Sequence, residues 1–333
     1  MDAPSQLRTE NAVRRIQVLD SIREGNLVVV AGTGVSIGSL DHTVGIPEVA
    51  GWQGLLSNGL ARCHHLGLIS EKARDIVDAE IEEGSVEFLV GAAQKITGWL
   101  GRRDGEKGYW LEETIGQLRF SKPGLIKAIA GLGGVLATLN YDSLLTQVTG
   151  RKAYHWGNLG DVNELLRRNR VKEFVLHLHG YWEDPESVIL DWKSYDTILN
   201  DEKTKQHLRD ITLSRTLLFI GCGDTFMDPN LQTWLKWAQG AMAGEKHRHY
   251  ILCRADDQQN LYKKLLEYGY LAPVVYGETY EDLEPFLIRL AHDAAAATEV
   301  VATSVDSTVI ANVVSGFVEI PSKASKLSDL WPR

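Results

Sequence analysis

The sequence predicts an α/β protein built on a doubly wound, mainly parallel, Rossmann-like sheet. Short apolar runs, such as the β-branched run 27–31 and the run 174–178, are typical of strands buried on both faces. Such runs alternate with segments of helical periodicity, which is the pattern of a parallel sheet with crossover helices. In residues 52–132, apolar positions instead recur every three or four residues without a strand. We therefore expect a helical insertion between the first and second strands.

Each predicted element has its own local signal. Apolar residues at helical spacing in 7–24 predict a first helix, which ends at Gly25 and Asn26, before the first strand at 27–31. Later strands are expected at 135–139, 174–178, 188–190, 217–220, 250–253 and 273–276. Helices are expected between and after them at 143–149, 160–169, 194–210, 230–242, 257–268 and 280–296.

One domain is expected over residues 1–297, because the alternating pattern continues that far. Residues 298–333 mix Val, Thr and Ser with spaced Ala and Gly, and they form a tail too short to fold alone. The apolar residues of this tail need a surface to cover. Two interpretations stay open: packing on the same domain, and contact with another subunit in a homo-oligomer or with a partner.

Composition favours a folded protein in a reducing compartment. Hydrophobic residues make up 44% of the 333 residues, and the net charge of -9 gives no general attraction to nucleic acid. Cys63, Cys222 and Cys253 form no CxxC pair, so we expect no disulfide framework and no zinc site. The chain begins without a basic, apolar leader and holds no run of about 18 apolar residues, so we expect a cytoplasmic protein with no membrane association.

A glycine-rich turn, Gly32-Thr33-Gly34-Val35-Ser36, directly follows the first strand. Such a turn can expose backbone N–H groups to phosphate oxygens, although a tight strand-to-helix connection without a ligand is the alternative. Gly38 comes one residue too late for the GxGxxG fingerprint, and no Gly-Lys-Ser/Thr follows. A dehydrogenase is therefore disfavoured and a Walker loop is excluded.

A second glycine-rich turn, Gly221-Cys222-Gly223, follows the predicted strand at 217–220. Asp228 and Pro229 then have the residue types of a helix start. Cys222 is interpreted as a small buried side chain and not as a nucleophile. Two glycine turns at one sheet edge favour an elongated, phosphate-bearing ligand such as a dinucleotide.

Asn140 and His179 each come directly after a predicted strand. If both strands are parallel members of one sheet, these side chains emerge at the same carboxyl edge, where open α/β sheets bind ligands. The Asn140 amide is suited to holding a ribose hydroxyl or a water, while Asp142 either caps the next helix or contacts a ligand. His177 and His179 make an HxH metal pair conceivable but lack a nearby third ligand, and Ser36 lacks the GxSxG elbow of a serine hydrolase.

Taken in this order, the segments resemble the sirtuin superfamily. Gly32 to Ser36 resembles its GAGxS loop, and Thr138-Leu139-Asn140-Tyr141-Asp142 resembles its TQNxD motif in the bacterial TxNYD form. His179-Gly180 matches the catalytic His-Gly, and Gly221 to Gly223 with Asp228 to Asn230 resembles the later glycine turn. The likeness spans about residues 25 to 295.

The departures from the pattern narrow the resemblance. Gly45-Ile46-Pro47-Glu48 is similar to the GIPDFR segment of protein deacylases, but Val49 and Ala50 replace Phe and Arg. The three cysteines cannot build the four-cysteine zinc module of those deacylases. The resemblance therefore points to the sirtuin-like NAD hydrolases of bacterial antiphage defence, which lack that module.

The resemblance implies NAD+ glycohydrolysis, which gives nicotinamide and ADP-ribose or a cyclic isomer. It makes Asn140 the residue that orients water or the ribose and His179 the general base. Residues 32–36 and 221–223 would hold the dinucleotide, and Asp142 would contact the nicotinamide amide. An NAD/ADP-ribose sensor without turnover and an NAD-dependent deacylase remain alternatives. An unregulated NAD+ hydrolase would harm its own cell, so a gated effector is expected, and the resemblance makes a HerA-type ATPase or a short Argonaute a possible regulatory partner.

Overall fold

The computed structural model describes residues 3–41, 43, 47–223, 249–265 and 270–304. Its sheet has seven strands, all paired in parallel, in the order β3-β4-β2-β1-β5-β6-β7. The strands are β1 (Leu27–Ala31), β2 (Val135–Thr138), β3 (Lys152–His155), β4 (Phe174–His177), β5 (Thr216–Ile220), β6 (His249–Arg254) and β7 (Leu271–Gly277). The predicted α/β class is confirmed, and the sheet is entirely parallel in the described residues.

Both faces of the sheet are covered, as the continuous apolar strands predict. Successive side chains of β1 alternate between two cores: Val29 and Ala31 belong to one, and Val28 and Val30 to the other. All five residues of β1 are buried. Burying a Val or Leu side chain stabilises a fold by about 1.5–3 kcal/mol, so these central strands contribute strongly to folding.

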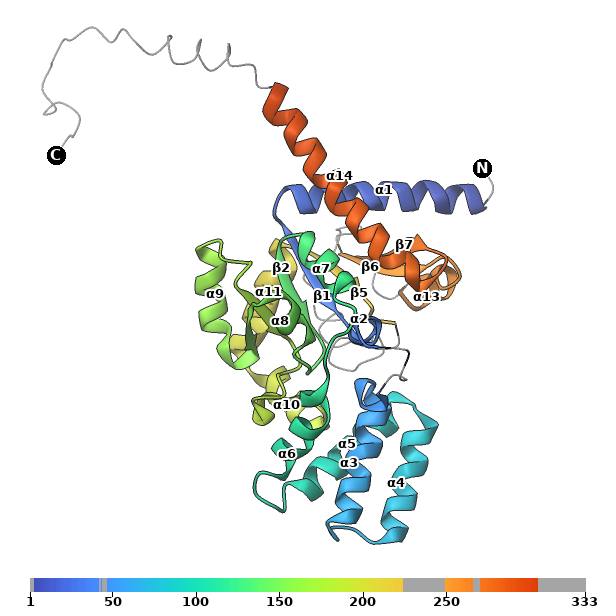
Figure 1. Cartoon of the computed structure of the whole chain (residues 1–333), viewed down its shortest axis with the longest axis vertical. Helices are drawn as coiled ribbons and strands as arrows, with labels where there is room; N and C mark the ends of the chain where they lie inside the picture. Colours follow the sequence, from blue (N-terminus) through green and yellow to red (C-terminus); the bar gives the residue numbers. More distant parts are fainter. Residues whose placement is uncertain (1–2, 42, 44–46, 224–248, 266–269, 305–333) are drawn as a thin grey trace, which may run out of the picture.

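The helices form two groups, one around the sheet and one at an end of the molecule (Figure 1). Around the sheet lie α1 (Ala3–Arg23), α2 (Thr33–Ser39), α7 (Gly124–Gly131), α8 (Leu144–Thr149), α9 (Leu159–Arg167), α10 (Trp192–Asn200), α11 (Glu202–Ser214), α13 (Gln258–Leu265) and α14 (Leu283–Ser304). At one end of the molecule, away from α1 and α14, lie α3 (Trp52–His65), α4 (Glu71–Glu83), α5 (Val86–Leu100) and α6 (Glu106–Glu113). The helical insertion predicted between the first two strands is confirmed.

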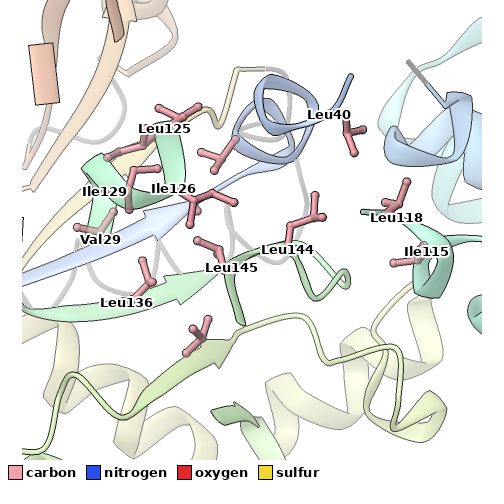
Figure 2. Close-up of a cluster of buried hydrophobic side chains, with 14 of the residues drawn as sticks. Val29, Leu40, Ile115, Leu118, Leu125, Ile126, Ile129, Leu136, Leu144 and Leu145 are labelled. Atoms are coloured by element: carbon pink, nitrogen blue, oxygen red, sulfur yellow. The ribbon is translucent and has the colours of Figure 1, made fainter. Parts of the chain in front are cut away.

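The insertion packs as a continuation of one sheet core. Figure 2 shows side chains of β1, β2, α7 and α8 in a single apolar cluster with Ile115 and Leu118, which follow α6. Inside the insertion, Trp110 is fully buried, and a Cβ on Gly59 would lie 2.8 Å from its ring. This close helix packing requires glycine at position 59.

Two strand predictions are corrected by the structure. Residues 188–190 are buried but form no strand, and the segment 152–155, which has no strand prediction, is the edge strand β3. The run at 188–190 is apolar because it packs between helices and loops. β3 lacks such a run because it lies at the sheet edge, where Lys152 is exposed.

Helix boundaries also differ from the predictions. The helix predicted at 194–210 is two helices, α10 and α11, because the Asp201 carboxylate accepts a hydrogen bond from the Thr204 N–H and starts a new helix. α14 continues to Ser304, past the predicted domain boundary at 297. The helix predicted at 230–242 and the tail residues 305–333 lie outside the described residues.

Candidate active site at the carboxyl edge of the sheet

The candidate site lies where the strand order reverses. β1 has β2 on one side and β5 on the other, so the chain leaves β1 in one direction and later returns to its opposite flank. Ligands of open α/β sheets bind outside the carboxyl ends of the strands at such a point. The first glycine turn follows β1, the second follows β5, and Asn140 follows β2.

The two glycine turns pack directly on each other. The Gly32 N–H donates to the Ile220 carbonyl and the Gly34 N–H to the Gly221 carbonyl, each at 2.9 Å. A Cβ on Gly32 would lie 2.7 Å from the Gly221 carbonyl oxygen, and Gly221 itself has φ of +66°. The glycines are therefore explained by close backbone approach. Since these N–H groups already have partners, the predicted contact to a phosphate must use other groups of the loops.

The remaining residues of the two turns have different surroundings. Thr33 begins α2, so a helix does start at the first turn, and Val35 is buried in the core. Cys222 Sγ lies 3.6 Å from the Val30 and Ile220 carbonyl oxygens, and burial raises the pKa of its thiol to about 12. A thiol with this pKa is not a nucleophile at neutral pH. Gly223 is exposed and its Cβ position is open.

Asn140, Ser36 and Asp142 form a buried hydrogen-bonded chain. The Asn140 amide Nδ2 donates to the Gly32 carbonyl at 3.0 Å and to Ser36 Oγ at 2.7 Å. Ser36 Oγ in turn donates to Asp142 Oδ2 at 2.6 Å. Because a carbonyl only accepts, the amide nitrogen must face Gly32, and both of its hydrogens are used. Asn140 can therefore act on a ligand only through its amide oxygen, as an acceptor.

Asp142 also accepts a hydrogen bond at the start of the next helix, although Ser143 and not Asp142 occupies the N-cap position. Its Oδ1 accepts a hydrogen bond from the Leu144 N–H at 2.9 Å, at the start of α8. Burial raises the pKa of this carboxyl, and the hydrogen bonds from Ser36 and Leu144 oppose that rise. The contact between Asp142 and nicotinamide stays a prediction.

The register of β2 and β4 brings Asn140 and His179 to the same edge. Thr138 pairs with His177, and the Leu178 N–H donates to the Thr138 carbonyl at 2.8 Å. Asn140 and His179 each lie two residues beyond that pair, so the predicted juxtaposition of the two strand ends is confirmed. Both residues are mostly buried, with exposed fractions of 9% and 5%.

His177 links the two strand ends through a hydrogen bond of its ring. Its Nδ1 lies 3.1 Å from the Asn140 carbonyl oxygen, which can only accept, so Nδ1 carries the proton. Burial lowers the pKa of His177 to about 4, which keeps the ring neutral. Within the described ranges, no three His, Cys, Asp or Glu side chains gather as a metal site would require.

Gly180 allows the sharp turn that follows His179. Its φ is +90°, and a Cβ there would lie 2.1 Å from the Ser187 carbonyl oxygen. No L-residue with a side chain fits this position without moving the backbone. The His-Gly pair therefore has a steric reason as well as a chemical one.

Sequence reasoning did not assign roles to Thr138 or Tyr141. Thr138 Oγ1 donates to the Ala31 carbonyl and accepts from the Asn140 N–H, both at 3.0 Å, so it fixes the turn that carries Asn140. The Tyr141 hydroxyl donates to the Ile189 carbonyl at 2.7 Å. Both residues lie in the TLNYD segment around Asn140. Their place in this motif is the sequence feature that could have indicated their roles.

Most of the candidate site lies in a stretch of the chain that matches a known domain family. Residues 134–273 match the SIR2-like domain family, and this stretch contains Asn140, His179 and the second glycine turn. The first glycine turn lies ahead of the matched residues.

A more specific relative is an NAD(+) hydrolase. The chain is 25% identical over 246 residues to the NAD(+) hydrolase ThsA of Enterococcus faecium, which covers 72% of this chain and 46% of that protein. The chain spans about half the length of this relative. The similarity is distant homology, and it agrees with the resemblance inferred from the motifs.

The cysteines lie in separate elements. Cys63, Cys222 and Cys253 are free and buried, in α3, after β5 and in β6. Burial raises the pKa of Cys63 to about 11 and that of Cys253 to about 12. Among the helices of the described residues, none is long and apolar enough to cross a membrane.

Proposed function

We propose that this protein is an NAD+ glycohydrolase that cleaves the bond between nicotinamide and ribose. The observation that carries the proposal is the Asn140 amide, held by Gly32 and Ser36 with its oxygen as the remaining acceptor, at the edge from which His179 also emerges. An acceptor of fixed orientation suits a water or a ribose hydroxyl, both of which donate hydrogen bonds. The distant homology to an NAD(+) hydrolase supports the same substrate.

In the proposed reaction, the bond between the ribose C1′ and the nicotinamide nitrogen breaks. Its electron pair moves to the nicotinamide ring, which loses its positive charge, and the ribose becomes an oxocarbenium ion. A water oxygen then bonds to C1′ and releases one proton. The products are nicotinamide, ADP-ribose and that proton, so atoms and charge balance. If a group of ADP-ribose itself replaces water, a cyclic isomer forms.

His179 is proposed to take the proton as the general base, because an imidazole suits that role near neutral pH. Asn140 is proposed to orient the water or the ribose through its amide oxygen. Gly32 to Ser36 and Gly221 to Gly223 are proposed to line the dinucleotide, and Asp142 to contact nicotinamide while it holds Ser36. The role of each residue rests on its motif and on its place at this edge.

The test is NAD+ consumption by the purified chain, with nicotinamide measured by chromatography. Asn140→Ala and His179→Ala are expected to lower the rate by about 100-fold or more, since removal of a positioned catalytic group has effects of this size. Asn200→Ala and His292→Ala are matched controls, because both side chains are exposed and lie on the helices α10 and α14. Normal turnover in both site variants would contradict the assignment.

Two other functions remain as outcomes of further assays. Deacylation of an acyl-lysine peptide with NAD+ would identify a deacylase, and ADP-ribose binding without turnover would identify a sensor. As part of the proposal, we keep a gated role in antiphage defence, with assembly into a homo-oligomer or regulation by a HerA-type ATPase or short Argonaute. These features follow from the resemblance alone.

A further inference from the structure

One backbone residue, Ile189, connects the turns that carry Asn140 and His179. The Ile189 N–H donates to the His179 carbonyl at 2.9 Å, and the Ile189 carbonyl accepts from the Tyr141 hydroxyl at 2.7 Å. Tyr141 directly follows Asn140. The peptide groups of residue 189 therefore join the ends of β2 and β4 beyond the sheet, in addition to the direct hydrogen bond from the Trp182 N–H to the Tyr141 carbonyl at 3.1 Å.

The helical insertion holds this connecting segment from its other side. The Ile189 side chain is 1% exposed and packs in one cluster with Val90 of α5 and with Tyr195 and Ile198 of α10. Two residues further on, Asp191 Oδ2 accepts a hydrogen bond from Thr97 Oγ1 of α5 at 2.6 Å. Residues 188–191 thus lie between α5 and the two turns of the candidate site.

Charged and apolar groups of α6 make a second contact to the same region. Lys107 lies near the carboxylates of Asp184, Glu186 and Asp191, whose charges oppose the lowering of its pKa by burial. A Cβ on Gly108 would lie 3.2 Å from Cγ of Pro185, so α6 closely approaches η5 (Pro185–Ser187). The loop between His179 and Asp191 is therefore held at several points by the insertion.

We propose that residues 188–191 couple the helical insertion to the catalytic edge, with Tyr141 and Thr97 as positioning residues. A shift of α5 would move Asp191 and Ile189, and the two hydrogen bonds of Ile189 would pass that shift to His179 and to the turn of Asn140. The insertion is thereby placed to regulate the site from outside it. The regulatory meaning rests on the proposed NAD+ hydrolysis, whereas the coupling itself does not.

The test compares hydrogen exchange of the full chain and two conservative variants. Tyr141→Phe removes the hydroxyl that binds Ile189, and Thr97→Val removes the hydroxyl that binds Asp191. Both should speed exchange of the peptide that covers residues 180–191 by about five-fold, which corresponds to one ordinary hydrogen bond. Because exchange needs no substrate, this result is independent of whether the protein hydrolyses NAD+.

The matched controls remove comparable hydroxyls elsewhere. Thr114→Val alters the insertion, but the Thr114 hydroxyl bonds to carbonyls of its own helix, and Tyr250→Phe loses a bond between β6 and Gln17 of α1. Neither should change exchange in residues 180–191. Unchanged exchange in both Tyr141→Phe and Thr97→Val, with both variants folded, would overturn the coupling.

Kinetics then test the meaning of the coupling for the proposed reaction. Both variants should lower kcat by about ten-fold or more and leave KM for NAD+ nearly unchanged, because misplaced groups slow the chemical step more than they weaken binding. Faster exchange together with unaltered kcat would keep the physical coupling and overturn its role in catalysis. Absence of any NAD+ turnover in the unmodified protein would contradict the proposed function and leave the exchange result standing.

Discussion

Ser36 is expected to stabilise the site more than an ordinary buried serine, because its hydroxyl has a donor on one side and an acceptor on the other. In Ser36→Ala, one N–H of Asn140 and one carboxylate oxygen of Asp142 lose their partner in a buried place. An unsatisfied buried polar group costs about 1–3 kcal/mol, so the free energy of unfolding should fall by about 2–4 kcal/mol at pH 7.

Ser39→Ala is the matched control. Ser39 lies in the same short helix and is fully buried, but its hydroxyl donates to the Val35 carbonyl within that helix. Its loss leaves no charged group without a partner, and a cost of about 1 kcal/mol or less is expected. Both values are measured by urea unfolding at one pH, with the slope of the unfolding curve compared between variants.

The pH dependence gives an independent check on Ser36. Burial raises the pKa of Asp142 above 3.8, and the Ser36 hydrogen bond opposes this, so Ser36→Ala should raise the pKa further. A raised pKa means that the folded state favours the protonated acid, and stability is lost as pH rises through the folded value. The cost of Ser36→Ala should therefore grow from acidic to neutral pH. Equal costs for Ser36→Ala and Ser39→Ala at every pH would refute the hydrogen-bonded chain.

Two further predictions concern the β4 end. Gly180→Ala should lower the free energy of unfolding by more than about 2 kcal/mol, because the added Cβ would lie 2.1 Å from the Ser187 carbonyl oxygen. Gly150 is the control: its φ is +68° but its Cβ position is open, so Gly150→Ala should cost only the backbone strain of about 1–2 kcal/mol. Equal decreases in Tm for Gly180→Ala and Gly150→Ala would contradict the role of this close contact. His177 has its pKa lowered from 6.5 to about 4, so wild-type protein should lose about 3 kcal/mol as pH falls through that interval. His177→Gln should lack this loss in acid unfolding curves, and parallel curves would contradict it.

The central strands could be predicted because their side chains are buried on both faces. Leu27–Ala31 and residues 174–176 are continuous apolar segments. Parallel pairing alone places Asn140, which follows β2, and His179, which follows β4, at one edge of the sheet. Local sequence was misleading at 188–190, where Ile189 packs against α5 and α10, and Val188 and Leu190 belong to the main core without forming a strand. No local sequence pattern predicted β3, because an edge strand needs no continuous apolar run.

The internal partners of the site could be predicted only in part. A glycine-rich turn indicates close approach of something to the backbone, but the sequence does not say whether a phosphate or another turn approaches. In the structure, Gly34 meets the turn at Gly221, nearly 190 residues away. The same holds for the Asn140 amide, whose donors are used by Gly32 and Ser36. Such long-range contacts follow from the complete fold and not from a motif.

The most direct test of the proposed function is the mass balance of NAD+ with the purified chain. We expect nicotinamide and ADP-ribose, or its cyclic isomer, to appear together in amounts equal to the NAD+ lost. Neither Asn140→Ala nor His179→Ala should produce them. Intact NAD+ in the presence of wild-type protein that binds ADP-ribose would contradict the account.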